Sequence, residues 1–554
     1  MPRGNVYLET FGCQMNELDS ELVSSQLRAL GYEFTTDAGA ADVVLYNTCS
    51  VRDHAEQKVR SRLGEMSVRK ERDPGVVVGV LGCMAERDGS DMMSRFPVVD
   101  VLCGPAELDK LPGLLDNAVR TRRSMLEDAS AAAPVRRNGR LASPVAARSA
   151  RQVALQGDAS RRSTTLAAAG DSLEMLDLSR SISASDHDGS AYVRITRGCN
   201  KFCTYCVVPH TRGAEIHRPP EHIIDECRRL ADAGVIEVTL LGQTVNHYRY
   251  EHGAQVLVDG VAQPQKGRSY KGGHRRDPFG GDRTTTFADL LKRIHDEVPA
   301  IQRLRFVTSY PRDFGDDVLE VMRDSPRMCR YLHIPAQSGS NDVLKRMNRG
   351  YTIEEYDDFI QRARSFLDQP EIGRPLMLAG DIIVGFCGET DADFEATAAL
   401  IRRTRYKNCF IFKYSPRPGT TAFDRIPDDV PEDVKKRRCN DLLAIQHEIS
   451  DEISQSMVGA TLDVFVQGVS ARERKRRRRA GDVALTIGGR DSDDAVDGPE
   501  TGEPVQMTGR TDGDLIVVFD CPAGGSPDDL IGRIKPVRIE RANTLTMFGR
   551  VASE

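Results

Sequence analysis

Three cysteines stand close together near the middle of the chain, in the phrase TRGCNKFCTYCVVPHTRG. Cys199, Cys203 and Cys206 follow a CxxxCxxC spacing, which brings three thiolates within reach of one another. Soft sulfur ligands suit iron–sulfur centres, and three of them can hold one face of a four-iron cluster. One iron then keeps an open position that can chelate a small molecule bearing an amino and a carboxylate group. The spacing therefore predicts an iron–sulfur centre with reactive chemistry at one iron.

A zinc site is the alternative for these three cysteines. Structural zinc sites generally use four ligands, and His210 is the only further candidate close in the sequence. A turn at Pro209–His210 could not easily fold back onto the metal, so we favour iron. Phe202 and Tyr205 stand between the ligands, and we expect these two rings to shield the cluster from solvent.

Another three cysteines, Cys13, Cys49 and Cys83, are spread over the first part of the chain. We call these three the first set, and Cys199, Cys203 and Cys206 the second set, after their order in the chain. Each follows an apolar run, and about one strand–helix unit separates each from the next. The carboxyl ends of neighbouring parallel strands meet at one edge of a sheet, so three distant thiolates can converge there. Small buried core cysteines are the alternative. The strand–Gly–Cys junction repeats at Gly12 and Gly82, which favours a second cluster.

The elements around this first set predict an α/β domain over residues 1–120, because apolar runs alternate with segments of helical spacing. Cys103 ends a fourth apolar run and is either a fourth ligand or a packing residue. We favour packing, since three ligands leave an iron open. Residues 121–187 are rich in Ala, Ser and Arg and predict a long disordered linker, with an ordered helical insertion as the alternative.

Strand signals resume after this segment, and residues 188–455 predict six βα units that close into a partial TIM-like barrel. A Gly-rich polar stretch at about 250–282 looks like a surface insertion, and residues 430–456 predict a charged helix. Residues 456–554 contain short strands and turns that favour a small β-barrel. That barrel has an insertion at about 471–500, which holds the basic run RERKRRRR.

Composition narrows the class of protein. The chain has 554 residues and a net charge of −6, so any contact with a polyanion needs local basic patches. It lacks an apolar run near the ~20 residues that span a bilayer, and the amino terminus lacks a signal-peptide pattern. We therefore expect a cytoplasmic protein without membrane contact. In a reducing cytoplasm, the 13 cysteines point to metal binding or catalysis and not to disulfides.

With these residues in view, the chain resembles a known family over nearly its whole length outside the three insertions. CxxxCxxC after the first barrel strand resembles the radical S-adenosylmethionine superfamily. The phrases FGCQMNELDSE, NTCSVRDHAEQKV and LGCMAER resemble the methylthiotransferase amino-terminal domain, and MTGRTDGDLIVVFD resembles the RNA-binding TRAM domain. GCQMN, NTCSVR and SPRPGT resemble the branch that methylthiolates carbon 2 of isopentenyl-adenosine beside the tRNA anticodon.

The resemblance implies two 4Fe–4S clusters, each held by one set of three cysteines, and S-adenosylmethionine as cosubstrate. One S-adenosylmethionine would methylate sulfur at the amino-terminal cluster, and a second would be cleaved to a radical at the other. It places S-adenosylmethionine contacts at seven strand-end positions, namely Gln243, Gln337, Ser338, Gly339, Gly380, Asp381 and Gly385. Two phrases depart from the family pattern, with Thr244 and His210 standing where Asn and Tyr are expected.

The resemblance also implies partners. The anticodon stem-loop of tRNA would be the substrate, and a low-potential electron donor and a sulfur source would be needed. Arg510 would contact the tRNA backbone, and Lys345 and Arg346, with the neighbouring Arg349, are further candidates for substrate contact. The basic run at 471–500 could add phosphate attraction or could be a solvated loop. The sequence does not reveal an oligomeric state and is compatible with a monomer.

Two other functions compete with this interpretation. One is a methylthiotransferase for a ribosomal-protein aspartate or for another modified adenosine, which the motif phrases above argue against. The other is a non-catalytic, metal-stabilised RNA-binding protein, which would hold zinc and would not cleave S-adenosylmethionine. Iron counting after anaerobic reconstitution separates the two classes.

Overall fold

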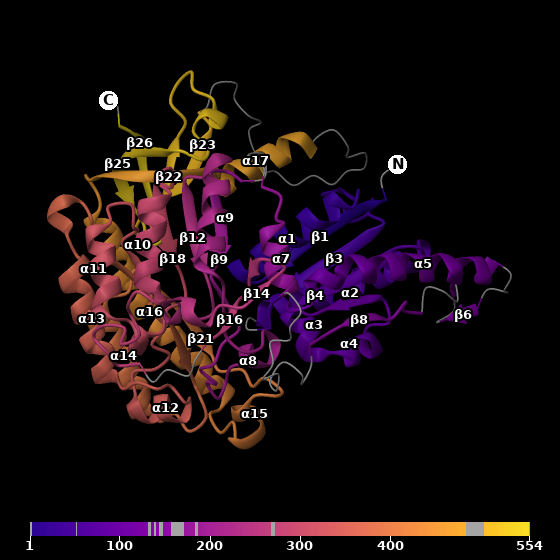
Figure 1. The fold of residues 1–554 in the computed structure, drawn as a ribbon, viewed down its shortest axis with the longest axis horizontal. Helices are drawn as coiled ribbons and strands as arrows, with labels where there is room; N and C mark the ends of the chain where they lie inside the picture. The colour runs from indigo at the N-terminus through magenta and orange to yellow at the C-terminus, as the bar shows by residue number, and fades with distance from the viewer. Residues whose placement is uncertain are drawn as a thin grey trace, which may run out of the picture.

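The computed structural model describes residues 3–50, 53–130, 135–137, 140–142, 148–156, 171–182, 187–267, 272–482 and 504–552. Figure 1 shows an amino-terminal α/β region in indigo, a larger central α/β region, and a small carboxy-terminal barrel in yellow. The predicted α/β class is confirmed. Among the described helices, none has both the length and the apolar composition needed to cross a membrane.

The amino-terminal region is built on one parallel six-stranded sheet of order β2-β1-β3-β4-β5-β8. Its strands are β1 (Asn5–Phe11), β2 (Glu33–Phe34), β3 (Val43–Thr48), β4 (Val77–Gly82), β5 (Val101–Cys103) and β8 (Gln152–Ala154). Every residue of β3 and β4 is buried, as expected for strands covered on both faces.

Helices cover both faces of this sheet and bury two separate apolar layers (Figure 1). On one face lie α1 (Gln14–Ala29) and α5 (Leu111–Ser130), with Leu18, Leu22 and Leu115 in the core. On the other lie α2 (Asp53–Arg72), α3 (Cys83–Asp88) and α4 (Ser90–Arg95). This layering holds the carboxyl ends of β1, β3 and β4 at one edge.

The prediction of a disordered linker over 121–187 is wrong for the residues that the structure describes. Helix α5 continues to Ser130, β6 (Val135–Arg137) pairs with β7 (Arg140–Ala142), and β8 is the sixth strand of the sheet. Helix α7 (Ser172–Leu178) buries two leucines in the same core. The domain boundary at 120 is therefore also wrong, because the short β8 and α7 owe their order to long-range contacts.

The central region contains the six parallel strands that the sequence predicts. They are β9 (Ser190–Arg194), β12 (Glu237–Leu241), β18 (Arg303–Phe306), β19 (Tyr331–His333), β20 (Met377–Val384) and β21 (Asn408–Lys413). They form two parallel sheets, β18-β12-β9 and β19-β20-β21, and a bridge between Leu304 and Met328 lies where the two meet. The helices between the strands are α9 (Pro220–Asp232), α10 (Phe287–Glu297), α11 (Asp316–Asp324), α13 (Ile353–Leu367) and α14 (Asp391–Thr404).

The predicted insertion at 250–282 is ordered where the structure describes it. Strand β13 (Arg249–Glu251) pairs with β17 (Thr284–Thr286), and β14 (Leu257–Val258) forms a hairpin with β15 (Val261–Ala262). Strand β16 (Gln265–Lys266) then joins β11 (Ile216–His217), which pairs with β10 (Thr196–Arg197). The insertion thus covers the segment that carries the CxxxCxxC cysteines.

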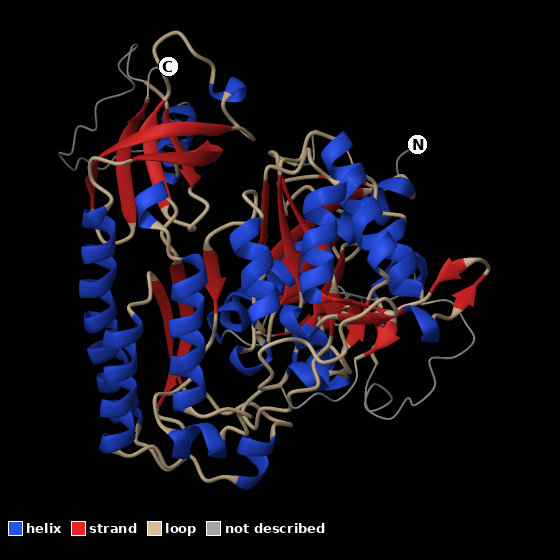
Figure 2. Cartoon of the chain, turned by 60° about the vertical axis from the view of Figure 1, so that its left-hand side comes forward, coloured by secondary structure: helices blue, strands red, loops and turns tan. Residues whose placement is uncertain are grey.

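The carboxy-terminal region is a closed five-stranded barrel, as predicted, set above the central region in Figure 2. The long helix α16 (Glu432–Ser456) leads into it. The strands are β22 (Thr461–Val469), β23 (Gln506–Arg510), β24 (Ile516–Asp520), β25 (Ile534–Ala542) and β26 (Thr546–Val551). Helix α17 (Ala471–Asp482) begins the predicted 471–500 insertion, and the remainder of that insertion lies outside the described residues.

Candidate functional site

The first set of cysteines converges at one edge of the amino-terminal sheet. Phe11, Thr48 and Gly82 are neighbours in one row, since Phe11 pairs with Thr48 and Thr48 with Gly82. Cys49 and Cys83 come one residue later, and Cys13 follows two residues after the end of β1. The sheet register therefore brings together three thiols that are far apart in sequence.

The backbone here leaves little room between the strands. Gly82 has φ of 86°, and a Cβ there would lie 2.6 Å from the carbonyl oxygen of Thr48, so only glycine fits. Behind the thiols, the Asn16 side-chain amide donates to the side-chain oxygen of Asn47 at 3.1 Å. The Asn47 side-chain amide donates in turn to the backbone carbonyl of Asn16 at 2.8 Å. A hydrogen bond with the Cys49 thiol lowers the pKa of Cys13 to about 6, against the effect of burial.

Cys103, at the end of β5, makes different contacts from these three cysteines. Its thiol donates to the Glu107 carbonyl oxygen at 3.2 Å, and the residue packs in the core beside α5. Burial, followed by the charge of Glu107, raises the pKa of this thiol. These contacts support packing as the role of Cys103 and leave three cysteines at the sheet edge.

The second set of cysteines occupies a tight loop after β10. The strand–Gly–Cys junction occurs here too, at Gly198. This residue has φ of 70°, and a Cβ there would meet the Ala214 carbonyl oxygen at 2.1 Å, so the position requires glycine. The Cys199 amide donates to the Gly213 carbonyl at 3.1 Å, and the Cys206 amide donates to the Cys203 carbonyl at 3.0 Å. Burial and the charge of Glu215 raise the pKa of Cys199 to about 12.

Arg349, which the sequence suggested as a substrate contact, lies at this loop instead. Its guanidinium donates to the Cys203 thiol at 3.4 Å and to the Pro335 carbonyl at 3.2 Å. The same group lies 4.6 Å from the ring centre of Tyr310 and 5.1 Å from that of Tyr351. A buried cation held between two rings can stabilise negative charge on the sulfur atoms. Sequence spacing gave no signal for this contact.

The expected shielding rings behave differently from one another. Phe202 is 56% exposed and has φ of 47°, so its predicted role as a shield is wrong in this structure. Tyr205 packs edge-on against Phe386 with ring centres 6.4 Å apart. Solvent exclusion on this side therefore depends on Tyr205 and its neighbours.

The two sets of cysteines are joined by one short element. Helix α8 (Val208–Thr211) follows Cys206 directly and packs against α3, which begins at Cys83. Arg212 follows α8 and donates to Asp19 of α1 at 2.8 Å. The charge of Arg212 also acts on Cys13 and Cys83. A residue beside the second set thus supplies positive charge to the first.

A second contact brings the SPRPGT phrase to the amino-terminal region. Arg417 donates to Glu56 of α2 at 2.8 Å, and Arg87 at the end of α3 pairs with the same carboxylate at 2.6 Å. Glu56 is almost fully buried. The phrase that distinguishes the tRNA branch in the sequence therefore docks beside the first set of cysteines.

Three of the residues predicted at the S-adenosylmethionine site carry polar side chains, namely Gln243, Gln337 and, within β20, Asp381. Gln337 has φ of 72° and is 7% exposed, its amide donates to the Asp381 carbonyl at 2.8 Å, and its side-chain oxygen has no partner among the described residues. His333 Nε2 lies 3.4 Å from the Asp381 carboxylate. Gln243 lies half-buried just after β12.

The other four predicted residues pack against protein. Ser338 lies 3.3 Å from the Thr397 hydroxyl, which also accepts from the Gly339 amide at 2.9 Å. A Cβ on Gly380 would meet the Tyr406 ring at 2.9 Å, and one on Gly385 would meet Lys435 at 2.3 Å. The structure thus gives these four a packing role, and their contact with S-adenosylmethionine stays a prediction.

The residues predicted to contact RNA lie in different environments. The guanidinium of Arg510 is paired with the buried carboxylate of Glu237 in the central region and is only 20% exposed, so it docks the barrel. The structure thus gives Arg510 a docking role, and its contact with RNA stays a prediction from the sequence. Lys345 is exposed at the end of α12 (Asn341–Arg346), whereas Arg346 donates to the Gly388 carbonyl at 3.1 Å.

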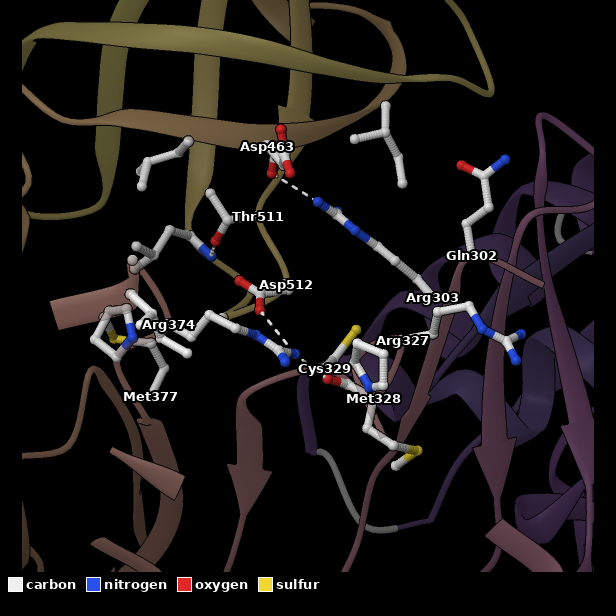
Figure 3. Close-up of a pocket in the computed structure, with 18 of the residues that line it drawn as sticks. Gln302, Arg303, Arg327, Met328, Cys329, Arg374, Met377, Asp463, Thr511 and Asp512 are labelled. Atoms are coloured by element: carbon white, nitrogen blue, oxygen red, sulfur yellow. Dashed lines mark hydrogen bonds and ion pairs between the residues drawn. The ribbon is translucent and has the colours of Figure 1, made fainter. Parts of the chain in front are cut away.

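A cavity of about 460 Å³ lies where the barrel meets the central region (Figure 3). Arg303 crosses it and donates to the carbonyl oxygens of Asp463 and Arg510 at 2.6 and 2.8 Å. Arg303 and Met377 begin β18 and β20, so the cavity lies at the amino ends of these strands. The cysteines lie at the carboxyl ends, where barrel enzymes place their chemistry. We therefore assign the cavity to the interface between the barrel and the central region, and not to the site of the cysteines.

Two family models match the chain, one over the amino-terminal sheet and one over most of the central region. The model of the Uncharacterized protein family UPF0004 matches residues 5–104, and that of the Radical SAM superfamily matches residues 193–401. The radical S-adenosylmethionine methyltransferase TsrM from Kitasatospora setae aligns over 76% of this chain and 74% of its own, with 14% identity and a TM-score of 0.43.

Curated relatives match over the full length. The tRNA-2-methylthio-N(6)-dimethylallyladenosine synthase of Rhodopirellula baltica is 40% identical over 99% of this chain and 95% of its own. The protein of the same name from Opitutus terrae is 34% identical over 99% and 97%. The chain therefore belongs to the tRNA-2-methylthio-N(6)-dimethylallyladenosine synthase family.

Proposed function

We propose that this protein transfers a methylthio group to carbon 2 of N6-dimethylallyladenosine, the isopentenyl-adenosine beside the anticodon of tRNA, in the cytoplasm. The observation that carries the proposal is the pairing of two cysteine triplets across α8 in a chain that matches synthases of this name from end to end. The alternative substrates lack such support.

Each triplet suits a 4Fe–4S cluster, which the radical S-adenosylmethionine enzymes carry. Cys13, Cys49 and Cys83 are three thiols at one sheet edge with Cys103 committed to packing. Cys199, Cys203 and Cys206 are three thiols in one loop. Three thiolates are the donor set for a cluster with one open iron. We assign these six residues as the ligands.

When bound, the clusters and S-adenosylmethionine supply the radical and the sulfur. The residues of this chain position and shield them. Arg349 holds positive charge against Cys203, and Arg212 does so beside Cys13 and Cys83. Gln243, Gln337 and Asp381 have the polar atoms to orient S-adenosylmethionine. The buried rings of Tyr310 and Tyr351 exclude water from the Arg349 side.

The proposal includes partners that a turnover needs. A low-potential electron donor must reduce the second cluster, and a sulfur source must restore the sulfur that leaves with the product. The anticodon stem-loop supplies the exposed base, which proteins read by stacking and edge contacts. Lys345 remains a candidate contact for this RNA.

Anaerobic iron counting tests the cofactors, and nucleoside analysis tests the substrate. We expect roughly eight irons per reconstituted chain, and roughly four in Cys13→Ala or Cys199→Ala. Cys103→Ala is the matched control and should keep all of them. Expression in a strain that lacks its own enzyme should restore the 2-methylthio form of N6-dimethylallyladenosine in tRNA. Bound zinc in place of iron at these cysteines, or tRNA without that nucleoside, would overturn the proposal.

A further inference from the structure

A compact group of metal-binding side chains lies beside the second set of cysteines and is not part of it. Glu215, His217 and His247 place a carboxylate oxygen and two ring nitrogens within 4.8 Å of one another, and all three residues are buried. Glu215 precedes β11 and His217 ends it, while His247 ends the short helix η3 (Val245–His247). The insertion covers the group, since a Cβ on Gly267 would lie 3.0 Å from both Glu215 and His217.

The three side chains converge at hydrogen-bond distances. Glu215 Oε1 lies 3.1 Å from His217 Nε2 and 2.7 Å from His247 Nδ1. The other carboxylate oxygen of Glu215 is buried and has no hydrogen-bond partner among the described residues. A carboxylate oxygen without a partner is costly in a protein interior unless a cation sits against it.

The second nitrogen of His217 supports the same conclusion. Nδ1 lies 2.6 Å from the carbonyl oxygen of Arg249 and 3.1 Å from its backbone nitrogen. We give weight to the shorter contact, in which the carbonyl can only accept and Nδ1 must donate. Nε2, the other nitrogen of the ring, then faces Glu215 Oε1, and a cation between these two atoms would be bound by both. Metal-bound histidines characteristically donate their other nitrogen to a carbonyl in this way.

We propose that Glu215, His217 and His247 bind one zinc ion, separate from both clusters. Two imidazoles and a carboxylate form a ligand set that zinc accepts with a fourth position left for water. Magnesium and calcium prefer oxygen ligands and do not suit this set. The proposal does not depend on the transferred group or on the tRNA substrate.

The location gives the ion a positioning role for the radical-forming loop. His217 pairs with Thr196 across β10 and β11, and β10 leads directly into the loop of Cys199. Thr244, next to η3, lies 3.8 Å from the Cys199 sulfur. One ion would thus tie β11, which pairs with the strand before Cys199, to η3, whose neighbour Thr244 contacts the Cys199 sulfur.

Zinc analysis of the reconstituted holoenzyme tests the site. After growth with zinc, we expect one zinc per chain in the wild type and in Cys199→Ala, because the cysteines are not its ligands. His217→Gln and His247→Gln should lose at least nine-tenths of that zinc. His222→Gln is the control, because His222 contacts Glu174 at 3.0 Å and lies outside the group. It should keep the ion.

Zinc-edge X-ray absorption on the wild type makes the test independent of how the variants fold. Nitrogen and oxygen ligands at ~2.0–2.2 Å support the site, whereas sulfur at ~2.3 Å would assign the zinc to cysteines and overturn it. A zinc-free wild type would also overturn it.

Discussion

Arg212 and Asp19 form a buried ion pair of 2.8 Å between the central and amino-terminal regions. Arg194 approaches the same carboxylate at 3.6 Å. Asp19 lies on α1, which begins beside Cys13, and Arg212 follows the loop of the second cysteines by one helical turn. The pair therefore fixes the separation of the two sets of cysteines.

Removing this ion pair should lower the free energy of unfolding. Arg212→Met leaves a buried carboxylate with less compensation, and we expect a loss of about 3–5 kcal/mol in the free energy of unfolding, measured by urea denaturation of the apoprotein. The exposed pair of Arg3 with Asp116 is the control, and Arg3→Met should cost ~0–1 kcal/mol. Equal costs for the two variants would show that the buried pair does not hold the regions together.

Arg349 should set the reduction potential of the second cluster. Hydrogen bonds and positive charge near cluster sulfur favour the reduced state, so Arg349→Met should lower the potential, on the order of tens of millivolts. Arg349→Lys keeps the charge but not the planar set of donors, so its potential should lie between that of the wild type and that of Arg349→Met. Potentiometric electron paramagnetic resonance in a Cys13→Ala background measures this cluster alone. Arg346→Met, which removes a contact to the Gly388 carbonyl, should leave the potential unchanged.

Glu174 should make the protein sensitive to acid. Burial opposes its charge, but Arg218 and His222 lower its pKa to about 2 from 4.5. Because the folded pKa is the lower one, the stabilisation is complete above pH 4.5 and is lost as the pH falls toward 2. Relative to Glu174→Gln, the wild type should be about 3 kcal/mol more stable near neutral pH, with the difference vanishing in acid.

Urea denaturation of the apoprotein at several pH values checks this dependence. The control is Glu452→Gln, since Glu452 is 61% exposed in its pair with Arg405 and should contribute ~0–1 kcal/mol at any pH. A Glu174 effect that does not change with pH would mean that its ion pairs are not the source of the stability.

The barrel should bind tRNA through β25 and not through Arg510. Arg538 is exposed and lies directly opposite Arg550, whose charge Glu540 pairs at 3.1 Å, so Arg538 is the exposed cation that this position offers to an RNA phosphate. Arg538→Ala should reduce the slope of log affinity against log salt by about one. Arg510→Ala should leave that slope unchanged, because its charge is paired with Glu237. The reverse result would restore the prediction made from the sequence.

The sequence was sufficient for features that depend on local pattern. Cys199, Cys203 and Cys206 could be found from spacing, and the strand-end argument for Cys13, Cys49 and Cys83 agrees with a register in which Phe11, Thr48 and Gly82 are neighbours. The six central strands and the terminal barrel have strong apolar alternation and were predicted for the same reason.

Features that depend on long-range contacts could not be predicted. β8 is three residues long and has order only because it extends the sheet beside β5. Helix α7 is seven residues long, and its order comes from the burial of Leu173 and Leu176 and from the ion pairs of its acidic residues, Glu174 with Arg218 and Asp177 with Arg194. The sequence predicts Arg349 and Arg510 to be surface cations, because it does not reveal that a cation's partner is a thiol or a buried carboxylate far along the chain.

The short helix α8 has a consequence for catalysis. Four residues of helix and one arginine span the way from Cys206 to the edge where Cys83 lies. A change in the separation of the two sets of cysteines would have to break the packing of α8 on α3 or the ion pair of Arg212 with Asp19. We therefore expect the target base to enter between two sets whose separation the fold itself determines.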